Sequence, residues 1–138
     1  MNALKIIIIG YGRMGREIKQ VAENRGHEIL MTIDMENKED FLAENLKKAD
    51  VAIEFTLPDA AFDNIMTCFK ADLPVVSGTT GWLDWFYDIR RYCLEHHQTF
   101  FYASNFSIGV NLFFKVNEYL AKIMNHYTNY DVEIEETH

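Results

Sequence analysis

The sequence predicts an α/β fold with a doubly wound, mostly parallel sheet. Short apolar runs of strand length alternate with segments of helical periodicity, and a glycine-rich turn joins the first two of them. The 138 residues are 49% hydrophobic, which is enough to form a buried core. Residues 4–9 are apolar apart from Lys5, as expected for a strand that is covered on both faces.

The alternation continues to residue 102. From Arg13, apolar residues recur at helical spacing up to Gly26, which has the position of a C-terminal helix cap. We expect strands at residues 4–9, 28–33, 51–55, 74–77 and 99–102. We expect helices at residues 13–26, 41–49, 60–70 and 82–97, the third introduced by Pro58.

After residue 104 the pattern changes. Residues 105–109 interrupt the alternation, and a longer helix is expected to run to about residue 126, with an apolar stripe that includes Leu112 and Val116. The final residues, 131–138, alternate between apolar and acidic side chains, which predicts a strand with one buried face.

Charge and composition exclude several classes of partner and site. Thirteen basic and 21 acidic residues give a net charge of -8, and no basic cluster larger than a pair occurs, so we expect neither nucleic acid nor a membrane as a partner. No apolar run is long enough for a bilayer span or a signal peptide, which predicts a cytoplasmic protein. Cys68 and Cys93 lack metal-ligand spacing, so we expect two reduced packing residues and no metal.

Two further groups invite a functional interpretation that we do not favour. His96 and His97 are adjacent, so they do not share a helix face, and a solvated helix end is the better interpretation. Aromatic residues of the segment 82–97 are expected to face the core rather than to form a stacking platform: Trp82, Trp85, Phe86 and Tyr92.

The glycine turn carries the first candidate site. Gly10, Gly12 and Gly15 fit the pattern GxGxxG between a buried strand and a helix, which is the context that a dinucleotide-binding turn requires. The first glycine permits the tight turn, the second lets the backbone approach a pyrophosphate, and the third lets helix and strand pack closely. The helix N-terminus attracts phosphate, and Arg13 would add a charge there. A purely structural turn is the alternative.

Asp34 is the candidate selector of the cofactor. It ends the second strand, 19 residues after Gly15, close to the place where an acidic residue binds the adenosine ribose hydroxyls. Its charge would repel a 2'-phosphate, so NADH is favoured, whereas Lys38 in the following loop leaves NADPH possible. The alternative is a polar residue that merely begins a loop.

Two further loops follow strands at the edge where ligands bind in open α/β sheets. The loop in "VVSGTTGW" contains Gly78, Thr79 and Thr80, which would lie near the nicotinamide half of a cofactor. The loop in "EFTLPDA" contains Phe55 and Thr56 and would line the same crevice, although Pro58 as an ordinary helix start explains it equally well.

Four stretches in this order, "GYGRMGRE", "SGTTGW", "ASNFSIGVN" and "VEIEETH", resemble the dihydrodipicolinate reductases of bacterial lysine and diaminopimelate biosynthesis. The resemblance implies an oxidoreductase with an N-terminal Rossmann domain and a C-terminal substrate and tetramerisation domain. It implies hydride transfer from NADH or NADPH to a cyclic dicarboxylate derived from 4-hydroxy-tetrahydrodipicolinate, in a homotetramer. Residues 1–104 would be the Rossmann domain, and residues 105–138 the hinge, helix and first strand of an incomplete α+β substrate domain.

The resemblance also implies roles for individual residues. Carried over by motif, Asp34 binds the ribose, and Gly78, Thr79 and Thr80 lie beside the nicotinamide ribose. His138 matches the first histidine of a Glu-x-His-His motif and would be the general acid that protonates the substrate. The pyrophosphate loop would comprise Gly10, Tyr11, Gly12, Arg13, Met14 and Gly15. The stretch that contacts the nicotinamide amide would comprise Ala103, Ser104, Asn105 and Phe106.

The sequence departs from the family pattern in two ways. The phosphate loop is one residue shorter than in many relatives, and the region between the second and third strands is compressed. The carboxylate-binding run that should follow His138 is absent, so we expect an N-terminal fragment that binds NADH without turning substrate over. The alternatives are another two-domain Rossmann dehydrogenase, such as an aspartate or homoserine dehydrogenase relative, and a non-catalytic nucleotide-sensing module.

Overall fold

The computed structural model describes residues 2–133, 135 and 137. It divides into two compact units, Met1–Ser104 and Asn105–His138, each with its own secondary structure. None of the helices in the described part of the chain combines the length and the apolar character that crossing a bilayer requires.

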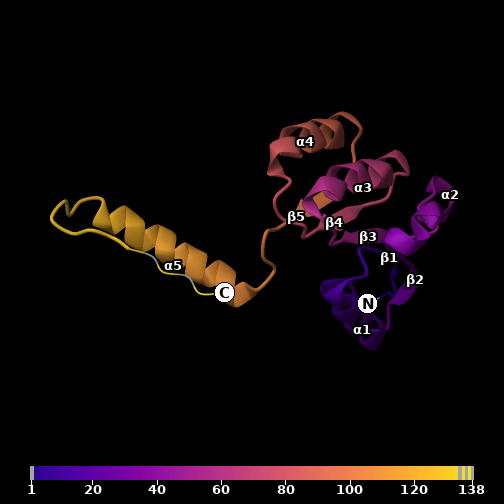
Figure 1. Cartoon of the computed structure of the whole chain (residues 1–138), viewed down its shortest axis with the longest axis horizontal. Helices are drawn as coiled ribbons and strands as arrows, with labels where there is room; N and C mark the ends of the chain where they lie inside the picture. The colour runs from indigo at the N-terminus through magenta and orange to yellow at the C-terminus, as the bar shows by residue number, and fades with distance from the viewer. Residues whose placement is uncertain (1, 134, 136, 138) are drawn as a thin grey trace. The chain divides into compact units, whose positions relative to one another are not determined.

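The first unit is built on a five-stranded sheet (Figure 1). Its strands are β1 Lys5–Ile9, β2 Glu28–Ile33, β3 Val51–Glu54, β4 Val75–Ser77 and β5 Phe100–Tyr102. All neighbouring pairs are parallel, and the order across the sheet is β2-β1-β3-β4-β5. The predicted α/β fold with a doubly wound parallel sheet is confirmed, and the fold is Rossmann-like.

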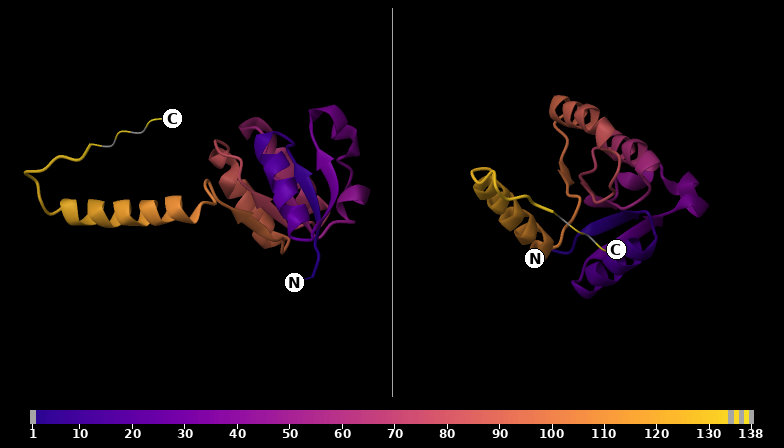
Figure 2. Two further views of the ribbon diagram at one scale, coloured as in Figure 1. Left: turned by 90° about the horizontal axis from the view of Figure 1, so that it is seen from below. Right: turned by 60° about the vertical axis from the view of Figure 1, so that its left-hand side comes forward.

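Helices cover both faces of this sheet. Successive residues of a strand point to opposite sides, so a continuous apolar run gives the sheet two apolar faces, and both have to be covered. On one side, Ile6 and Ile8 pack with Ala22 of α1. On the other side, Ile7 and Ile65 belong to the larger core that the remaining helices close. Figure 2 shows α1 on the opposite side of the sheet from α3 and α4. The helices are α1 Arg13–Asn24, α2 Ala43–Leu46, α3 Pro58–Lys70 and α4 Phe86–Glu95.

Two segments differ from the sequence prediction because short 3-10 helices replace α-helix or loop. The first, η1 Met35–Asp40, precedes a helix α2 that is shorter than predicted. The second, η2 Leu83–Trp85, opens the segment predicted as one helix from residue 82. A 3-10 turn has three residues rather than 3.6, so it changes which side chains face the sheet. Trp82 is buried as predicted, but Trp85 and Phe86 are 55% and 36% exposed, and the core prediction is wrong for both.

The end of α4 matches the interpretation of the two histidines. The helix stops at Glu95, with His96 as its C-terminal cap. Both His96 and His97 are exposed, and His97 has a positive φ of 55°. They form a solvated helix end, as predicted.

The second unit contains the helix α5, Ile108–Met124, which the side chain of Ser107 caps by accepting a hydrogen bond from the backbone N–H of Val110. The strand predicted at its end is wrong for residues 131–133, 135 and 137, which form no strand. A strand needs a neighbour for its backbone groups, and the described part of this unit contains no other strand. The remaining residues of the predicted strand, Ile134, Glu136 and His138, lie outside the described residues.

Candidate functional site

The candidate site begins where all five strands end. The register places the last residues of the strands in one row across the sheet, in the order Ile33, Ile9, Glu54, Ser77 and Tyr102. The chain leaves this row through Asp34, Gly10, Phe55, Gly78 and Ala103. The predicted loops therefore start side by side at the carboxyl edge, where open α/β sheets bind ligands.

Close backbone contacts explain two of the three glycines in the turn after β1. Gly10 has a φ of +92°, and a Cβ atom there would lie 2.0 Å from the carbonyl oxygen of Phe55. A Cβ atom at Gly15 would lie 2.2 Å from the carbonyl oxygen of Gly10. Both positions therefore exclude any larger residue.

Gly12 differs, because a Cβ atom there would meet nothing within 4 Å. It is the N-cap of α1, and no side chain caps the helix or places an acidic group in its first turn. The first backbone N–H groups of α1 thus keep their capacity to bind an anion. Arg13 and Met14 are exposed in this first turn.

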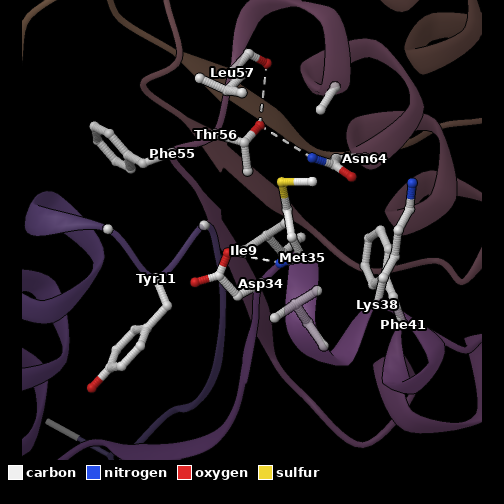
Figure 3. A pocket seen from close by; sticks show the side chains of 14 residues that line it. Ile9, Tyr11, Asp34, Met35, Lys38, Phe41, Phe55, Thr56, Leu57 and Asn64 are labelled. Carbon is white, nitrogen blue, oxygen red and sulfur yellow. Dashed lines mark hydrogen bonds between the residues drawn. The ribbon is translucent and has the colours of Figure 1, made fainter.

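A cavity of about 340 Å³ lies beside this turn (Figure 3). It is bounded by the loops after β1, β2 and β3 and by the start of α3. This is the point where the chain changes direction across the sheet, since β2 lies on one side of β1 and β3 on the other. The residues that line it are Ile9, Gly10, Tyr11, Gly12, Ile33, Asp34, Met35, Lys38, Phe41, Phe55, Thr56, Leu57, Ala60 and Asn64.

Asp34 has a structural role as the N-cap of η1, where its side chain and that of Asn37 form a capping box. Its Oδ1 atom accepts a hydrogen bond of 2.7 Å from the backbone N–H of Met35, and its own N–H donates to Oδ1 of Asn37. This pair of bonds starts η1. Figure 3 shows the other carboxylate oxygen directed toward the side of the cavity where Tyr11 lies.

Several lining residues were not predicted from the sequence. Met35, Phe41, Leu57 and Ala60 make part of the wall apolar, and Asn64 of α3 adds an amide whose Nδ2 atom donates to the hydroxyl of Thr56. Leu57 and Ala60 belong to the predicted stretch "EFTLPDA". No motif singles out Met35, Phe41 and Asn64, because they come from η1, the residue that follows it and α3, which only the fold brings together. The segment of Lys38 is the helix η1 rather than a loop, and Lys38 does line the cavity.

A buried cluster of polar side chains lies next to the cavity. Glu54, Ser77 and Thr79 are 0%, 0% and 4% exposed. Three hydroxyl groups donate to the carboxylate of Glu54: those of Ser77, Thr79 and Thr56. The sequence offered one signal for this cluster, an acidic residue at the end of an otherwise apolar strand.

The loop after β4 lies against the loop after β3. A Cβ atom at Gly78 would lie 2.2 Å from the ring of Phe55, so a larger residue there would displace that ring. Trp82 donates a hydrogen bond of 2.7 Å from its indole N–H to the carbonyl oxygen of Thr79. Thr80 is exposed, and none of the residues 78–80 is among those that line the cavity.

The remaining predicted site residues lie at the boundary between the units. Ala103 and Ser104 follow β5 and end the first unit. Asn105 and Phe106 begin the second, where Oδ1 of Asn105 accepts from the backbone N–H of Ser107. Their contact with a nicotinamide stays a prediction. His138 lies outside the described residues.

The cysteines are separate from the cavity lining. Cys68 is buried in α3, and burial raises the pKa of its thiol to about 12, with a further contribution from the negative charge of Glu54. Cys93 is partly buried, and burial raises its pKa as well. Within residues 2–133, 135 and 137, no group of three or more His, Cys, Asp or Glu side chains could hold a metal ion.

Comparison with solved structures agrees with the fold. A UDP-N-acetylglucosamine 3-dehydrogenase from Acidithiobacillus ferrooxidans superposes with a TM-score of 0.57 at 15% identity, over 74% of this chain and 38% of that one. A homoserine dehydrogenase from Thiobacillus denitrificans gives a TM-score of 0.52 at 12% identity, over 74% and 30%. At these identities the likeness concerns the fold alone.

Sequence comparison identifies the family. The profile described as "Dihydrodipicolinate reductase, N-terminus" matches residues 4–106. A 4-hydroxy-tetrahydrodipicolinate reductase from Christiangramia forsetii is 48% identical over 135 residues, and one from Staphylococcus haemolyticus is 32% identical over 142. Each alignment covers 98% of this chain and 56% of the relative, so the chain spans little more than half their length. The chain therefore belongs to the dihydrodipicolinate reductase family, in the N-terminal part that the profile describes.

Proposed function

We propose that this chain is the cofactor-binding part of a reductase that transfers hydride from NADH to a cyclic dicarboxylate of the dihydrodipicolinate type, forming tetrahydrodipicolinate. One observation carries the proposal. The cavity at the carboxyl edge lies between an uncapped helix N-terminus at Gly12 and the carboxylate of Asp34. A dinucleotide needs both groups, because a helix N-terminus can bind its pyrophosphate and a carboxylate can accept from its ribose hydroxyls.

Each loop then has a part in binding. The backbone N–H groups at the start of α1, with Arg13 beside them, bind the pyrophosphate, and the apolar wall that includes Met35 and Phe41 packs against the adenine. The loops that contain Thr56 and Thr79 bind the nicotinamide ribose. Residues 103–106 contact the nicotinamide amide. The bound cofactor supplies the hydride, while this chain holds and orients it.

The catalytic part of the proposal rests on relatives that are longer than this chain. The two reductases named above support the substrate class. His138 would protonate the substrate, with binding groups for its carboxylates supplied by the second domain. We propose that the whole enzyme is a homotetramer of the cytoplasm, and that this chain alone binds NADH without turnover.

Calorimetric titration of the chain with NADH and NADPH tests the cofactor assignment. We expect NADH to bind more tightly, because the charge of Asp34 repels a 2'-phosphate. In Asp34→Asn the amide oxygen can still accept from Met35 N–H, so η1 should persist while the charge is lost. The ratio of the two affinities should therefore shift toward NADPH by about tenfold, or about 1.4 kcal/mol.

Asp50→Asn is the matched control. Asp50 is also an exposed carboxylate, and it accepts a hydrogen bond from the backbone N–H of Lys5, but it lies at the opposite edge of the sheet. Its NADH and NADPH affinities should equal those of the wild type. Absence of NADH binding to the wild-type chain would contradict the proposed function.

A further inference from the structure

Glu54 is a buried carboxylate for which the proposed function has so far no use. It is the last residue of β3 and is 0% exposed, in a strand whose other side chains are apolar. Removing a carboxylate from water is costly unless hydrogen bonds replace its hydration. An apolar side chain would pack at this position with less cost, so the carboxylate calls for an explanation other than core packing.

All hydrogen bonds to Glu54 come from donors on two neighbouring strand ends. Its Oε2 atom accepts from the hydroxyl of Ser77 at 2.5 Å. Its Oε1 atom accepts from the hydroxyl of Thr79 at 2.7 Å, from the hydroxyl of Thr56 at 2.5 Å and from the backbone N–H of Thr56 at 3.1 Å. Both oxygens are thus occupied by groups of the protein.

These bonds join the loop after β3 to the loop after β4. Thr56 belongs to the first loop and lines the cavity, and Thr79 belongs to the second. The two threonines also bind each other directly, since the backbone N–H of Thr56 donates to Oγ1 of Thr79 at 2.7 Å. The Thr79 hydroxyl therefore accepts from one loop and donates to Glu54 at 2.7 Å, with the carbonyl oxygen of Thr56 as a more distant acceptor at 3.4 Å.

We propose that Glu54 is a positioning residue for the nicotinamide half of the cofactor. Its carboxylate fixes the hydroxyl orientations of Thr56 and Thr79 and thereby the distance between their loops, so that the two loops meet the nicotinamide ribose without reorganisation. This rests on the proposed function, in which these two loops bind that ribose. Because Glu54 is fully buried, it acts through the threonines and not by touching the cofactor.

Replacement of the carboxylate tests this role. Glu54→Met keeps a side chain of similar length and removes both acceptor oxygens, whereas Glu54→Gln keeps an acceptor for the threonine hydroxyls and can donate to the oxygen of Ser77. NADH and ADP are the two probes, because ADP contains the adenosine and pyrophosphate but lacks the nicotinamide ribose. We expect Glu54→Met to bind NADH about tenfold more weakly, with ADP affinity changed by less than about twofold.

The affinity of Glu54→Gln for both ligands should stay within about threefold of the wild type, since it preserves the acceptor for the threonine hydroxyls and can still form a hydrogen bond with Ser77. An equal loss of NADH affinity in both variants would overturn the proposal, because the charge rather than the hydrogen bonds would then matter. An equal loss of affinity for NADH and for ADP in Glu54→Met would overturn the proposal as well, since a general structural role of Glu54 would affect the binding of both ligands alike.

A second variant covers the case in which Glu54→Met does not fold. Ser77→Ala removes only the donor to Oε2 and alters no residue that is proposed to touch the cofactor. This variant should bind NADH about threefold more weakly and bind ADP with unchanged affinity, because the freed carboxylate loses its fixed orientation. Unchanged NADH affinity in Ser77→Ala would then count against the role of Glu54. If the wild type binds ADP but not NADH, the proposed function itself fails, a result that differs from all of these.

Discussion

Gly12 and Gly15 belong to the same turn, but an added methyl group would meet different surroundings at the two positions. At Gly15 it would lie 2.2 Å from the carbonyl oxygen of Gly10, whereas at Gly12 it would meet no atom within 4 Å. The φ of Gly12 is -75°, which any residue adopts. Gly15 therefore serves the fold, whereas Gly12 has room to serve a ligand.

Alanine substitutions should separate the two roles. Gly12→Ala should change the free energy of unfolding by less than about 1 kcal/mol, the usual cost at an N-cap, but should weaken NADH binding by about tenfold or more because the methyl group occupies the path of the pyrophosphate. Gly15→Ala should lower the free energy of unfolding by about 2 kcal/mol or more, because backbone must move. Urea denaturation and calorimetric titration measure the two effects. A Gly12→Ala variant with normal NADH affinity would contradict the assignment of the turn.

At this scale the sequence predicts residues whose role depends on local spacing. The glycines and Asp34 follow from their distance to a strand end, and each lies at the edge where it was expected. The hydrogen-bond partners of Glu54 and Asn64 could not be found in this way, because most of them lie on other loops. Their contacts depend on the strand register, which spacing within a single segment does not contain.

At the scale of elements, α3 carries the most strongly perturbed thiol of the chain. Cys68 is buried between this helix and the sheet, and burial raises its pKa to about 12. In the unfolded chain a thiol ionises near pH 8.5. Between these two values the folded state therefore holds one proton more than the unfolded state, and the free energy of unfolding decreases as the pH rises.

The pH dependence of stability tests this burial. The contribution of Cys68 is fully present below about pH 8.5 and should be lost with a slope of up to about 1.4 kcal/mol per pH unit above it. Urea denaturation under reducing conditions, at pH 8 and pH 10, measures the slope. In Cys68→Ala the decrease should be shallower than in the wild type, whatever the variant's stability at pH 8. Cys93→Ala is the control and should reduce the slope less, since that thiol is only partly buried.

The helices and strands were predicted well where apolar burial or a single helix-starting residue determines them. Strand β1 follows from an apolar run that is buried on both faces, and Pro58 stands at the first position of α3 as expected. Two segments have misplaced boundaries, and side-chain capping accounts for the first of them only. Asp34 and Asn37 start η1, and a 3-10 turn turns Trp85 to solvent, although periodicity alone favoured a continuous helix.

At the scale of the whole chain, both hydrophobic cores lie within the first unit. The clusters on the two faces of the sheet contain only residues before position 104. In the second unit, α5 is supported by ion pairs of Glu118 with Lys115 and Lys122, and these lie within the helix itself. Its apolar side chains are exposed, among them Ile108 at 78% and Val116 at 65%. Apolar surface of this kind tends to associate with other chains.

Separate production of residues 1–104 tests this division. Because all five strands and both cores are retained, the shorter chain should unfold cooperatively. The midpoint of its thermal unfolding should lie within about 5 °C of that of the 138-residue chain, which corresponds to about 1 kcal/mol.

Removal of α5 should also abolish concentration-dependent self-association, measured by sedimentation velocity. A matched variant, Leu112→Lys with Val116→Lys in the full chain, should reduce association equally while keeping the helix, since lysine is a good helix former. If residues 1–104 fail to fold, α5 contributes to the stability of the sheet. If the lysine variant still associates, the surface responsible lies on the first unit.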